Sequence, residues 1–168
     1  VPGLIPVEDF FKLLSEKKFC SSTWLRTMEQ LDYLEEPDMF HDIFGHIPLL
    51  ANPIFSEFAL EFGRIGVANI DDTDFLEQLQ RLYWFTIEFG LIKTEKGRRI
   101  YGAGLISSFG ESISSLSNDV IVTTFDLKKV LNQSFKNDEL QNLYFEINNL
   151  SELYDAIIKL KQDSLCGK

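Results

Sequence analysis

The sequence predicts a mainly α-helical fold with a few short β-strands. Apolar residues recur at helical spacing in several segments, and most of these segments open with a Pro, Asn or Asp start signal. Two short runs, residues 120–125 and 143–147, are rich in β-branched and aromatic side chains and are the best strand candidates. Because 168 residues without repeats or linkers amount to one domain in length, we expect residues 1–168 to form a single domain.

The N-terminal part of the chain contains two predicted helices separated by an irregular segment. Acidic residues follow Pro6 in the first turn of an amphipathic pattern, which predicts a helix over residues 7–17. Residues 19–26 are rich in aromatic and hydroxyl side chains and predict a loop or short strand. The next helix is expected to begin at Pro37 and to carry His41. A backbone N–H at the first position of a helix has no helical partner, so proline, which has no N–H, is well suited to that position.

Two longer helices follow. Asn52 and Pro53 begin a helix whose amphipathic pattern fades near Gly66. Acidic and hydroxyl residues at 71–74 cap the next helix, which has one apolar stripe through Leu76, Leu79, Leu82 and Tyr83 and becomes apolar on nearly every side at residues 84–89. We therefore expect this helix to end in the core.

The C-terminal half mixes strands and helices. Gly97 predicts a turn, and the residues after it predict a strand at 99–104 that leads into a helix at 105–111. A last helix is predicted over residues 151–161.

Charge and composition exclude several classes of protein. With 26 acidic and 16 basic side chains, the net charge of -10 repels phosphate backbones and anionic membrane surfaces, so we expect no nucleic-acid or membrane binding. No apolar run is long enough for a membrane span, and the N-terminus lacks the basic region of a signal peptide. Cys20 and Cys166 have no CxxC spacing, so neither a zinc ribbon nor a disulfide framework is indicated and we expect a cytoplasmic protein.

The two histidines of the chain, His41 and His46, lie close together in the sequence. Imidazole is the commonest protein ligand of transition metals, so this segment is a candidate metal site. On a straight α-helix a separation of five places the two rings about 140° apart. Gly45 and Pro48 could loosen or end the helix and bring the rings together. The alternative is one core histidine and one surface histidine.

Glu88 is the candidate third ligand. It lies in the apolar stretch at 84–89, where a carboxylate is costly to bury unless it is protonated, paired or bound to a metal. Arg81 and Lys93 do not share its helical face, although Glu88 could also lie on a solvent-exposed stripe.

Two histidines and one carboxylate favour iron over zinc at this site. Such a set leaves coordination positions open and suits non-haem Fe(II). A zinc hydrolase of the H-E-x-x-H type needs a Glu beside its first histidine and the second histidine four residues on, whereas here Asp42 is the neighbour and the spacing is five. Zinc remains the competing metal.

Three segments resemble the signatures of the pterin-dependent aromatic amino acid hydroxylases: P-D-x-x-H-D-x-x-G-H-x-P-L at 37–49, YWFTIEFGL at 83–91 and YGAGLISSFGE at 101–111. The resemblance extends from residue 1 to about residue 160 and implies the catalytic fold of that family. Because the chain opens on Val rather than Met, we expect a single catalytic domain that lacks an upstream N-terminal part.

The resemblance implies roles for the metal site. His41, His46 and Glu88 would bind Fe(II) and be the catalytic centre, and Ser107 and Glu111 would hold the ligand imidazoles from outside. For Ser107 the alternative is simple helix packing.

The resemblance also implies binding sites for cofactor and substrate. Gly3, Leu4 and Phe10 match the pterin-binding stretch, in which a phenyl ring stacks on the pterin; the alternative for Phe10 is a core contact. Arg26 would clamp the substrate carboxylate, a task suited to a bidentate guanidinium.

Three further positions bear on the substrate. Asp38 would steady the arginine, and Trp84 would form part of the pocket for the substrate ring. Phe135 matches a late active-site aromatic residue, whereas residues 34–35 depart from the pattern of the animal enzymes before Glu-Pro-Asp.

The implied activity is that of a monooxygenase that uses Fe(II), O₂ and a tetrahydropterin (tetrahydrobiopterin or a related one) to hydroxylate an aromatic amino acid. We expect phenylalanine to be converted to tyrosine, in phenylalanine catabolism, by a monomer, since no terminal heptad run is present. The alternatives are an inactive or truncated member that binds metal without turnover, tryptophan or tyrosine as substrate, and a zinc hydrolase.

Overall fold

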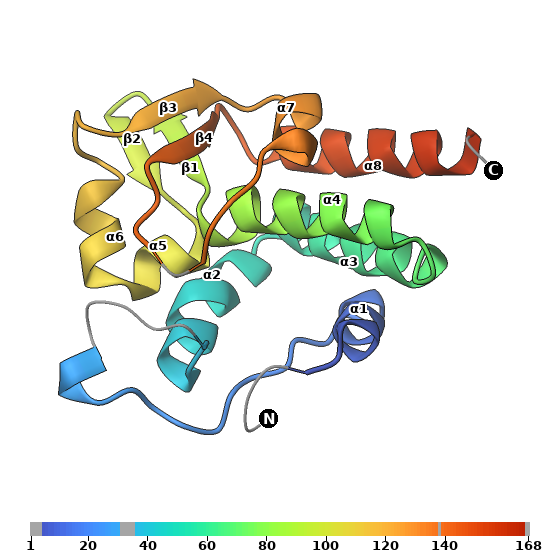
Figure 1. Cartoon of the computed structure of the whole chain (residues 1–168), viewed down its shortest axis with the longest axis horizontal. Coiled ribbons are helices and arrows are strands. Elements are labelled where there is room, and N and C mark those ends of the chain that lie inside the picture. Colours follow the sequence, from blue (N-terminus) through green and yellow to red (C-terminus); the bar gives the residue numbers. More distant parts are fainter. Residues whose placement is uncertain (1–4, 31–35, 138, 167–168) are drawn as a thin grey trace.

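The computed structural model describes residues 5–30, 36–137 and 139–166 of the chain, and it is mainly helical with one small sheet (Figure 1). Helices α3, α4 and α8 lie side by side, and the sheet lies beside one end of α4 (Figure 1). The helices are α1 (Val7–Ser15), η1 (Met28–Gln30), η2 (His41–His46), α2 (Ile47–Leu50), α3 (Pro53–Ala68), α4 (Thr73–Tyr83), η3 (Trp84–Glu88), α5 (Ala103–Ser107), α6 (Phe109–Ser114), α7 (Leu127–Asn132) and α8 (Ser151–Cys166).

The sheet has four strands in the order β2-β1-β4-β3, namely β1 (Leu91–Thr94), β2 (Gly97–Ile100), β3 (Ile121–Thr124) and β4 (Leu143–Ile147). β1 and β2 form an antiparallel hairpin, whereas β4 pairs in parallel with both β1 and β3. The parallel pair β3–β4 needs a crossover, which α7 provides. β1 follows the helix end that carries Glu88, and it pairs with β4 from the C-terminal part of the chain. The sheet therefore holds this part of the chain next to that helix end.

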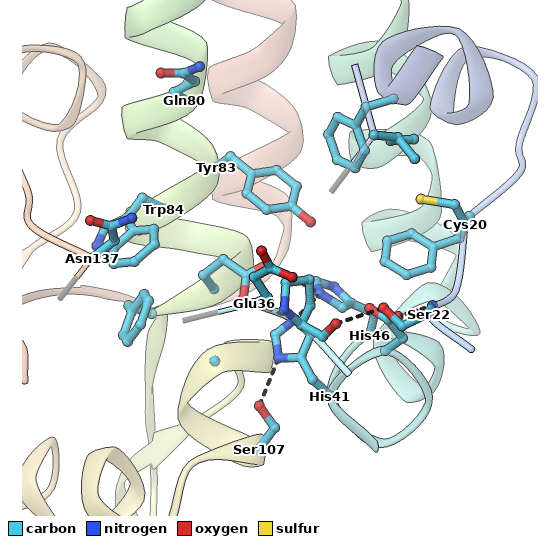
Figure 2. A pocket seen from close by; sticks show the side chains of 18 of the residues that line it. Cys20, Ser22, Glu36, His41, His46, Gln80, Tyr83, Trp84, Ser107 and Asn137 are labelled. Atoms are coloured by element: carbon cyan, nitrogen blue, oxygen red, sulfur yellow. Dashed lines mark hydrogen bonds and ion pairs between the residues drawn. The ribbon is translucent and has the colours of Figure 1, made fainter. Parts of the chain in front are cut away.

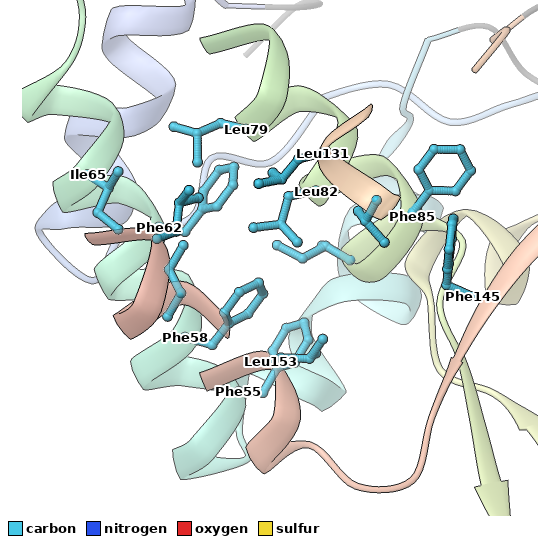
Figure 3. Close-up of a cluster of buried hydrophobic side chains, with 14 of the residues drawn as sticks. Phe55, Phe58, Phe62, Ile65, Leu79, Leu82, Phe85, Leu131, Phe145 and Leu153 are labelled. Carbon is cyan, nitrogen blue, oxygen red and sulfur yellow. The ribbon is translucent and has the colours of Figure 1, made fainter. Parts of the chain in front are cut away.

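The main hydrophobic core lies between α3, α4 and α8 (Figure 3). Phe58, Leu79, Leu82 and Leu153 are completely buried there. The leucines of α4 are those of the predicted apolar stripe, so the sequence pattern identified the buried face of this helix. Burial of such side chains is the dominant favourable term in folding, and it makes α4 a rigid support for the residues that follow it.

The structure confirms the mainly helical class and the two strand runs, and it corrects the segments before and between them. β1 was not predicted, and the strand expected at 99–104 is β2, which ends at Ile100. The helix α7 was also missed. These elements are only four to six residues long, too short to show a clear apolar periodicity, so only pairing and packing in the folded chain identify them.

Both segments that carry the candidate ligands are π-helical. η2 contains both histidines, and η3 ends at Glu88 with a hydrogen bond of 2.8 Å from the N–H of Phe89 to the carbonyl of Trp84, five residues earlier. In a π-helix, residues five apart lie about one turn apart. His46 therefore lies one turn after His41, and the separation of about 140° expected for an α-helix does not arise.

The looser turn expected around Gly45 is present as η2, and Gly45 also has a packing role that was not predicted. The chain stays helical through Gly45 and Pro48, so neither residue breaks the helix. A Cβ on Gly45 would lie 2.9 Å from the Cβ of Ala103 and 3.0 Å from its Cα. Glycine here allows η2 to pack directly on α5. Similarly, a Cβ on Gly102 would lie 2.2 Å from the carbonyl oxygen of Glu88, so glycine lets the start of α5 pass against η3.

No helix in the described part of the chain is, by itself, long and apolar enough to cross a bilayer. Taken together, 41–50 and 53–68 satisfy the length and composition of a span, but they are bent by 108° at the break between them.

We predict that Gly45→Ala destabilises the protein by about 1–3 kcal/mol, because the added methyl forces η2 away from the backbone of α5. Urea unfolding at neutral pH measures the change. The matched control is Gly104→Ala on α5, where the nearest atom to an added Cβ is a carbon of the Phe89 ring at 3.1 Å, and it should cost less. Equal stability of Gly45→Ala and the wild type would show that the η2–α5 contact is not tight.

Candidate metal centre

A cavity of about 440 Å³ lies between η2, the junction of α4 and η3, α5 and the segment at 19–26 (Figure 2). This volume is within the range of small-molecule sites. The cavity is lined by aromatic side chains together with a few polar ones, including His41, His46, Glu88, Arg26 and Ser107. The predicted ligand residues therefore meet at one concave and largely apolar site.

The candidate ligand atoms are close together. The Nε2 atoms of His41 and His46 are 2.9 Å apart, and the carboxylate of Glu88 lies 3.5 Å from His41 Nε2 and 3.2 Å from His46 Nε2. Two imidazole nitrogens that face each other at this distance need a proton or a cation between them. The three residues form the one group of potential metal ligands found among the described residues.

The spacing fits a single metal ion. With bonds of about 2.1 Å, two ligands at right angles lie about 3.0 Å apart and two at tetrahedral angles about 3.4 Å apart. The three measured separations span these values, so the protein presents a preformed set of two nitrogens and one oxygen. Three protein ligands leave coordination positions for other molecules.

Each histidine is held from the side away from the ligand atoms. The Oγ of Ser107 lies 2.8 Å from His41 Nδ1, which directs Nε2 of that ring towards the other ligands (Figure 2). The ring of His46 packs on Phe19, with 4.6 Å between ring centroids. The contact between Ser107 and an imidazole is the one that the sequence signature implied, whereas Phe19 was not singled out.

Glu88 remains ionised in this apolar site. Burial opposes the charge, but the two histidines and the hydroxyl of Tyr83 outweigh it and lower the pKa of Glu88 to about 2. Burial, reinforced by this carboxylate, raises the pKa of Tyr83 well above its usual value, so its hydroxyl stays protonated. Tyr83 was missed as a site residue, and its place five residues before Glu88 is a one-turn spacing only in a π-helix.

A second missed residue, Asp42, connects the site to the irregular segment. Its carboxylate accepts a hydrogen bond of 2.6 Å from the backbone N–H of Ser22, and the Oγ of Ser22 donates to the carbonyl of Pro37. These bonds hold the segment that carries Phe19 against η2. The signal in the sequence was an acidic side chain next to His41 in a helix that is otherwise apolar around it.

Asp38 holds Arg26, as the sequence signature implied. Its carboxylate accepts hydrogen bonds from Nε and Nη2 of Arg26 at 3.0 and 2.7 Å and from the backbone N–H of His41 at 3.0 Å. Nη1 of Arg26 donates to the carbonyl of Ser107. One edge of the guanidinium is thus committed to Asp38, and a substrate carboxylate would have to use the remaining N–H groups on Nη1 and Nη2.

The contacts of Glu111 differ from those implied. Its buried carboxylate accepts hydrogen bonds from the backbone N–H of Gln141 at 2.9 Å and from the hydroxyl of Tyr144 at 2.7 Å, and it does not hold an imidazole. Burial raises the pKa of Glu111. The expectation that Glu111 orients a ligand histidine is therefore corrected: it anchors the loop before β4. The sequence could not show this, because the partners lie 30 residues or more away.

The remaining predicted residues line the cavity where the structure describes them. Trp84 and Phe135 stack on each other with 4.3 Å between ring centroids, and Phe10 lies edge-on to Tyr83 at 5.4 Å. Gly3 and Leu4, predicted to bind the pterin, and residues 34–35 lie outside the described residues.

A helical domain that places two histidines and one carboxylate in an aromatic cavity has the arrangement of mononuclear non-haem iron proteins. A family model described as biopterin-dependent aromatic amino acid hydroxylase matches residues 1–164, and the chain belongs to that family.

Several relatives are known. The phenylalanine-4-hydroxylase of Chromobacterium violaceum is 48% identical over 157 residues, which cover 93% of this chain and 52% of that protein. The tyrosine 3-monooxygenase of Homo sapiens is 33% identical and is covered to 29%. A crystal structure of the C. violaceum phenylalanine hydroxylase with iron(III) and 7,8-dihydrobiopterin matches with a TM-score of 0.90 and 45% identity, over 99% of this chain and 61% of that one. The chain thus spans about half the length of the bacterial relatives.

We predict that Ser107→Ala weakens metal binding about 10–100-fold, because His41 loses the contact that orients its ring. Titration of the purified protein with Co(II), followed by visible absorption, measures the affinity. Ser112→Ala on α6, whose exposed hydroxyl bonds only to a local carbonyl, is the matched control and should bind cobalt like the wild type. An unchanged affinity in Ser107→Ala would show that this contact does not support the site.

We predict that Asp38→Asn costs about 2 kcal/mol of stability at pH 7 and much less near pH 2.5. Burial alone would raise the pKa of Asp38, but hydrogen bonds from Arg26 and from the backbone N–H groups of His41 and Arg26 outweigh it and lower the pKa to about 2. A lowered pKa stabilises the fold above the unfolded value of 3.8, and this stabilisation is lost as the pH falls towards 2. Urea unfolding of both proteins at the two pH values tests this, and a difference independent of pH would contradict it.

Proposed function

We propose that the protein is an iron- and tetrahydropterin-dependent monooxygenase that hydroxylates an aromatic amino acid, with phenylalanine converted to tyrosine. The observation that carries the proposal is the cluster of His41, His46 and Glu88 at the cavity, with ligand atoms 2.9–3.5 Å apart. Membership of the family and the phenylalanine-4-hydroxylase relatives support the choice of substrate.

The residues present fit the cofactors. His41, His46 and Glu88 would hold the iron, and the aromatic wall that includes Phe10 would hold the flat pterin ring. When bound, iron and the reduced pterin would supply the chemistry that activates O₂, with one oxygen atom going to the substrate ring and the other to the pterin, which is oxidised.

The protein supplies position and exclusion of water. The free N–H groups of Arg26 would bind the carboxylate of the amino acid, which directs its side chain into the cavity. Trp84 and Phe135 would pack against the ring of the substrate, and their apolar faces would keep water from the reacting atoms. Glu88 stays anionic, which favours a cation between the two imidazoles.

We further propose that the protein acts as a monomer in the cytoplasm and binds small molecules only. Its net charge of -10 supports the absence of nucleic-acid and anionic-membrane partners. A second candidate function is metal binding without turnover, which the group of three potential ligands would support by itself.

We expect the chain, loaded anaerobically with Fe(II) and then given tetrahydrobiopterin, L-phenylalanine and O₂, to form tyrosine detectable by chromatography. Glu88→Ala should lower the rate roughly a thousandfold, since a metal ligand contributes several kcal/mol. Glu95→Ala, an exposed carboxylate in the turn between β1 and β2, is the matched control and should keep the wild-type rate.

Two outcomes would decide against a monooxygenase. Full iron occupancy without tyrosine would favour the metal-binding alternative. Hydrolytic activity with zinc that needs no O₂ would favour a zinc enzyme.

A further inference from the structure

Gln141 is a buried residue on the loop between α7 and β4, and its side chain makes one long-range hydrogen bond and two within the loop. It is 9% exposed. Its Oε1 accepts a hydrogen bond of 3.2 Å from Nε1 of Trp84, and its Nε2 donates to the carbonyls of Lys136 and Glu139 at 2.7 and 3.0 Å. Three of the four hydrogen bonds that a primary amide can form are therefore used within the protein.

These bonds connect the indole of Trp84 to the loop between α7 and β4. The two carbonyls bound by the Gln141 amide lie on either side of Asn137, which lines the cavity. Both Trp84 and Asn137 are seen on the same side of the cavity in Figure 2. A glutamine has both an acceptor for the indole and two donors for the loop, and an apolar side chain of the same size would have neither.

The indole is held on its faces as well as at its edge. Phe135 stacks on Trp84 with an interplanar angle of 13°, and Phe89 lies 4.4 Å away between ring centroids with an angle of 32°. Gln141 binds the one polar atom of the indole. With these contacts in place, rotation of Trp84 would break the hydrogen bond and both ring contacts.

The main chain of Gln141 is anchored independently of its side chain. Its N–H donates to the buried carboxylate of Glu111, and its carbonyl oxygen lies 2.9 Å from the hydroxyl of Tyr144, whose single proton it shares with that carboxylate. Glu111 lies four residues after Ser107, which contacts His41. The support of the aromatic wall is thus built on α6, the helix directly after the one that ends at Ser107, but it does not itself contact a candidate metal ligand.

We propose that Gln141 is a positioning residue for the aromatic substrate: it holds the Trp84–Phe135 wall in the orientation that binds the substrate ring. This inference rests on the proposed function, because it assumes that an aromatic amino acid occupies the cavity. Gln141 acts through Trp84 and has no part in metal binding. Replacing Gln141 should therefore weaken substrate binding and leave metal binding unchanged.

Gln141→Met tests the proposal, since methionine keeps the length and loses all three side-chain bonds. The full chain is loaded with Co(II), and the dissociation constant of L-phenylalanine is measured by isothermal titration calorimetry. We expect it to rise about tenfold in Gln141→Met, with cobalt stoichiometry and affinity unchanged. Gln133→Met in the same loop, whose side chain bonds only to the neighbouring Ser134 carbonyl, should behave like the wild type.

A spectroscopic measurement distinguishes positioning from a general loss of stability. The chain has two tryptophans, so its ¹⁵N–¹H spectrum shows two indole resonances, and Trp84→Phe identifies the one from Trp84. In Gln141→Met this resonance should shift upfield and exchange faster with water. If that variant does not fold, Gln141→Glu retains the acceptor for the indole and loses both donors; it should keep the resonance and still weaken L-phenylalanine binding.

The possible failures are distinct. Wild-type affinity for L-phenylalanine in Gln141→Met, or in Gln141→Glu if only that variant folds, would overturn the positioning role and leave the proposed function intact. Equal losses of cobalt and L-phenylalanine binding would also overturn it, because they indicate a general structural role. A cobalt-loaded wild-type protein that binds no aromatic amino acid would overturn both proposals.

Discussion

The arrangement of the site depends on the π-helical turn of η2. Only this turn places His41 and His46 one above the other, so that their Nε2 atoms lie 2.9 Å apart. A second π-helical segment, η3, ends at Glu88 and directs its carboxylate to the same point. The wider turns are less stable than α-helix in general, and the close packing of η2 on α5 through Gly45 helps to retain this one.

Buried charge is compensated by specific partners throughout the site. The carboxylate of Asp38 is completely buried and is matched by the guanidinium of Arg26, which is itself 7% exposed. Glu88 faces two imidazoles and the hydroxyl of Tyr83. In a site of low dielectric constant each such pair is strongly oriented, and the loss of one partner leaves an expensive unpaired group. The polar residues therefore fix geometry more than they add stability.

The sequence was sufficient to name the three candidate ligands, because each stands in a contiguous segment with its own chemical signal and a family signature. Histidines five apart and a glutamate in an apolar helix end already suggested a metal site, and the family signatures supplied the rest. It was misleading for Glu111 and silent about Gln141. The contacts of these residues join positions 30 or more apart in the chain, and no pattern of local spacing reports such pairs. At Gly45 the helix was expected to loosen or end: it loosens into the π-helix η2 and does not end, and the close packing that needs glycine there comes from a neighbouring helix.

By itself the sequence determined the helical class, the buried face of α4, the identity of the three candidate ligands and the contact of Asp38 with Arg26. These follow from periodicity, residue chemistry and signatures that are contiguous in the chain. Only the tertiary structure decided how the ligands converge, through two π-helical segments, and which loop supports the aromatic wall. The physical reason is that helix type and long-range hydrogen bonds depend on packing between elements, whereas periodicity depends only on which face of each element is apolar.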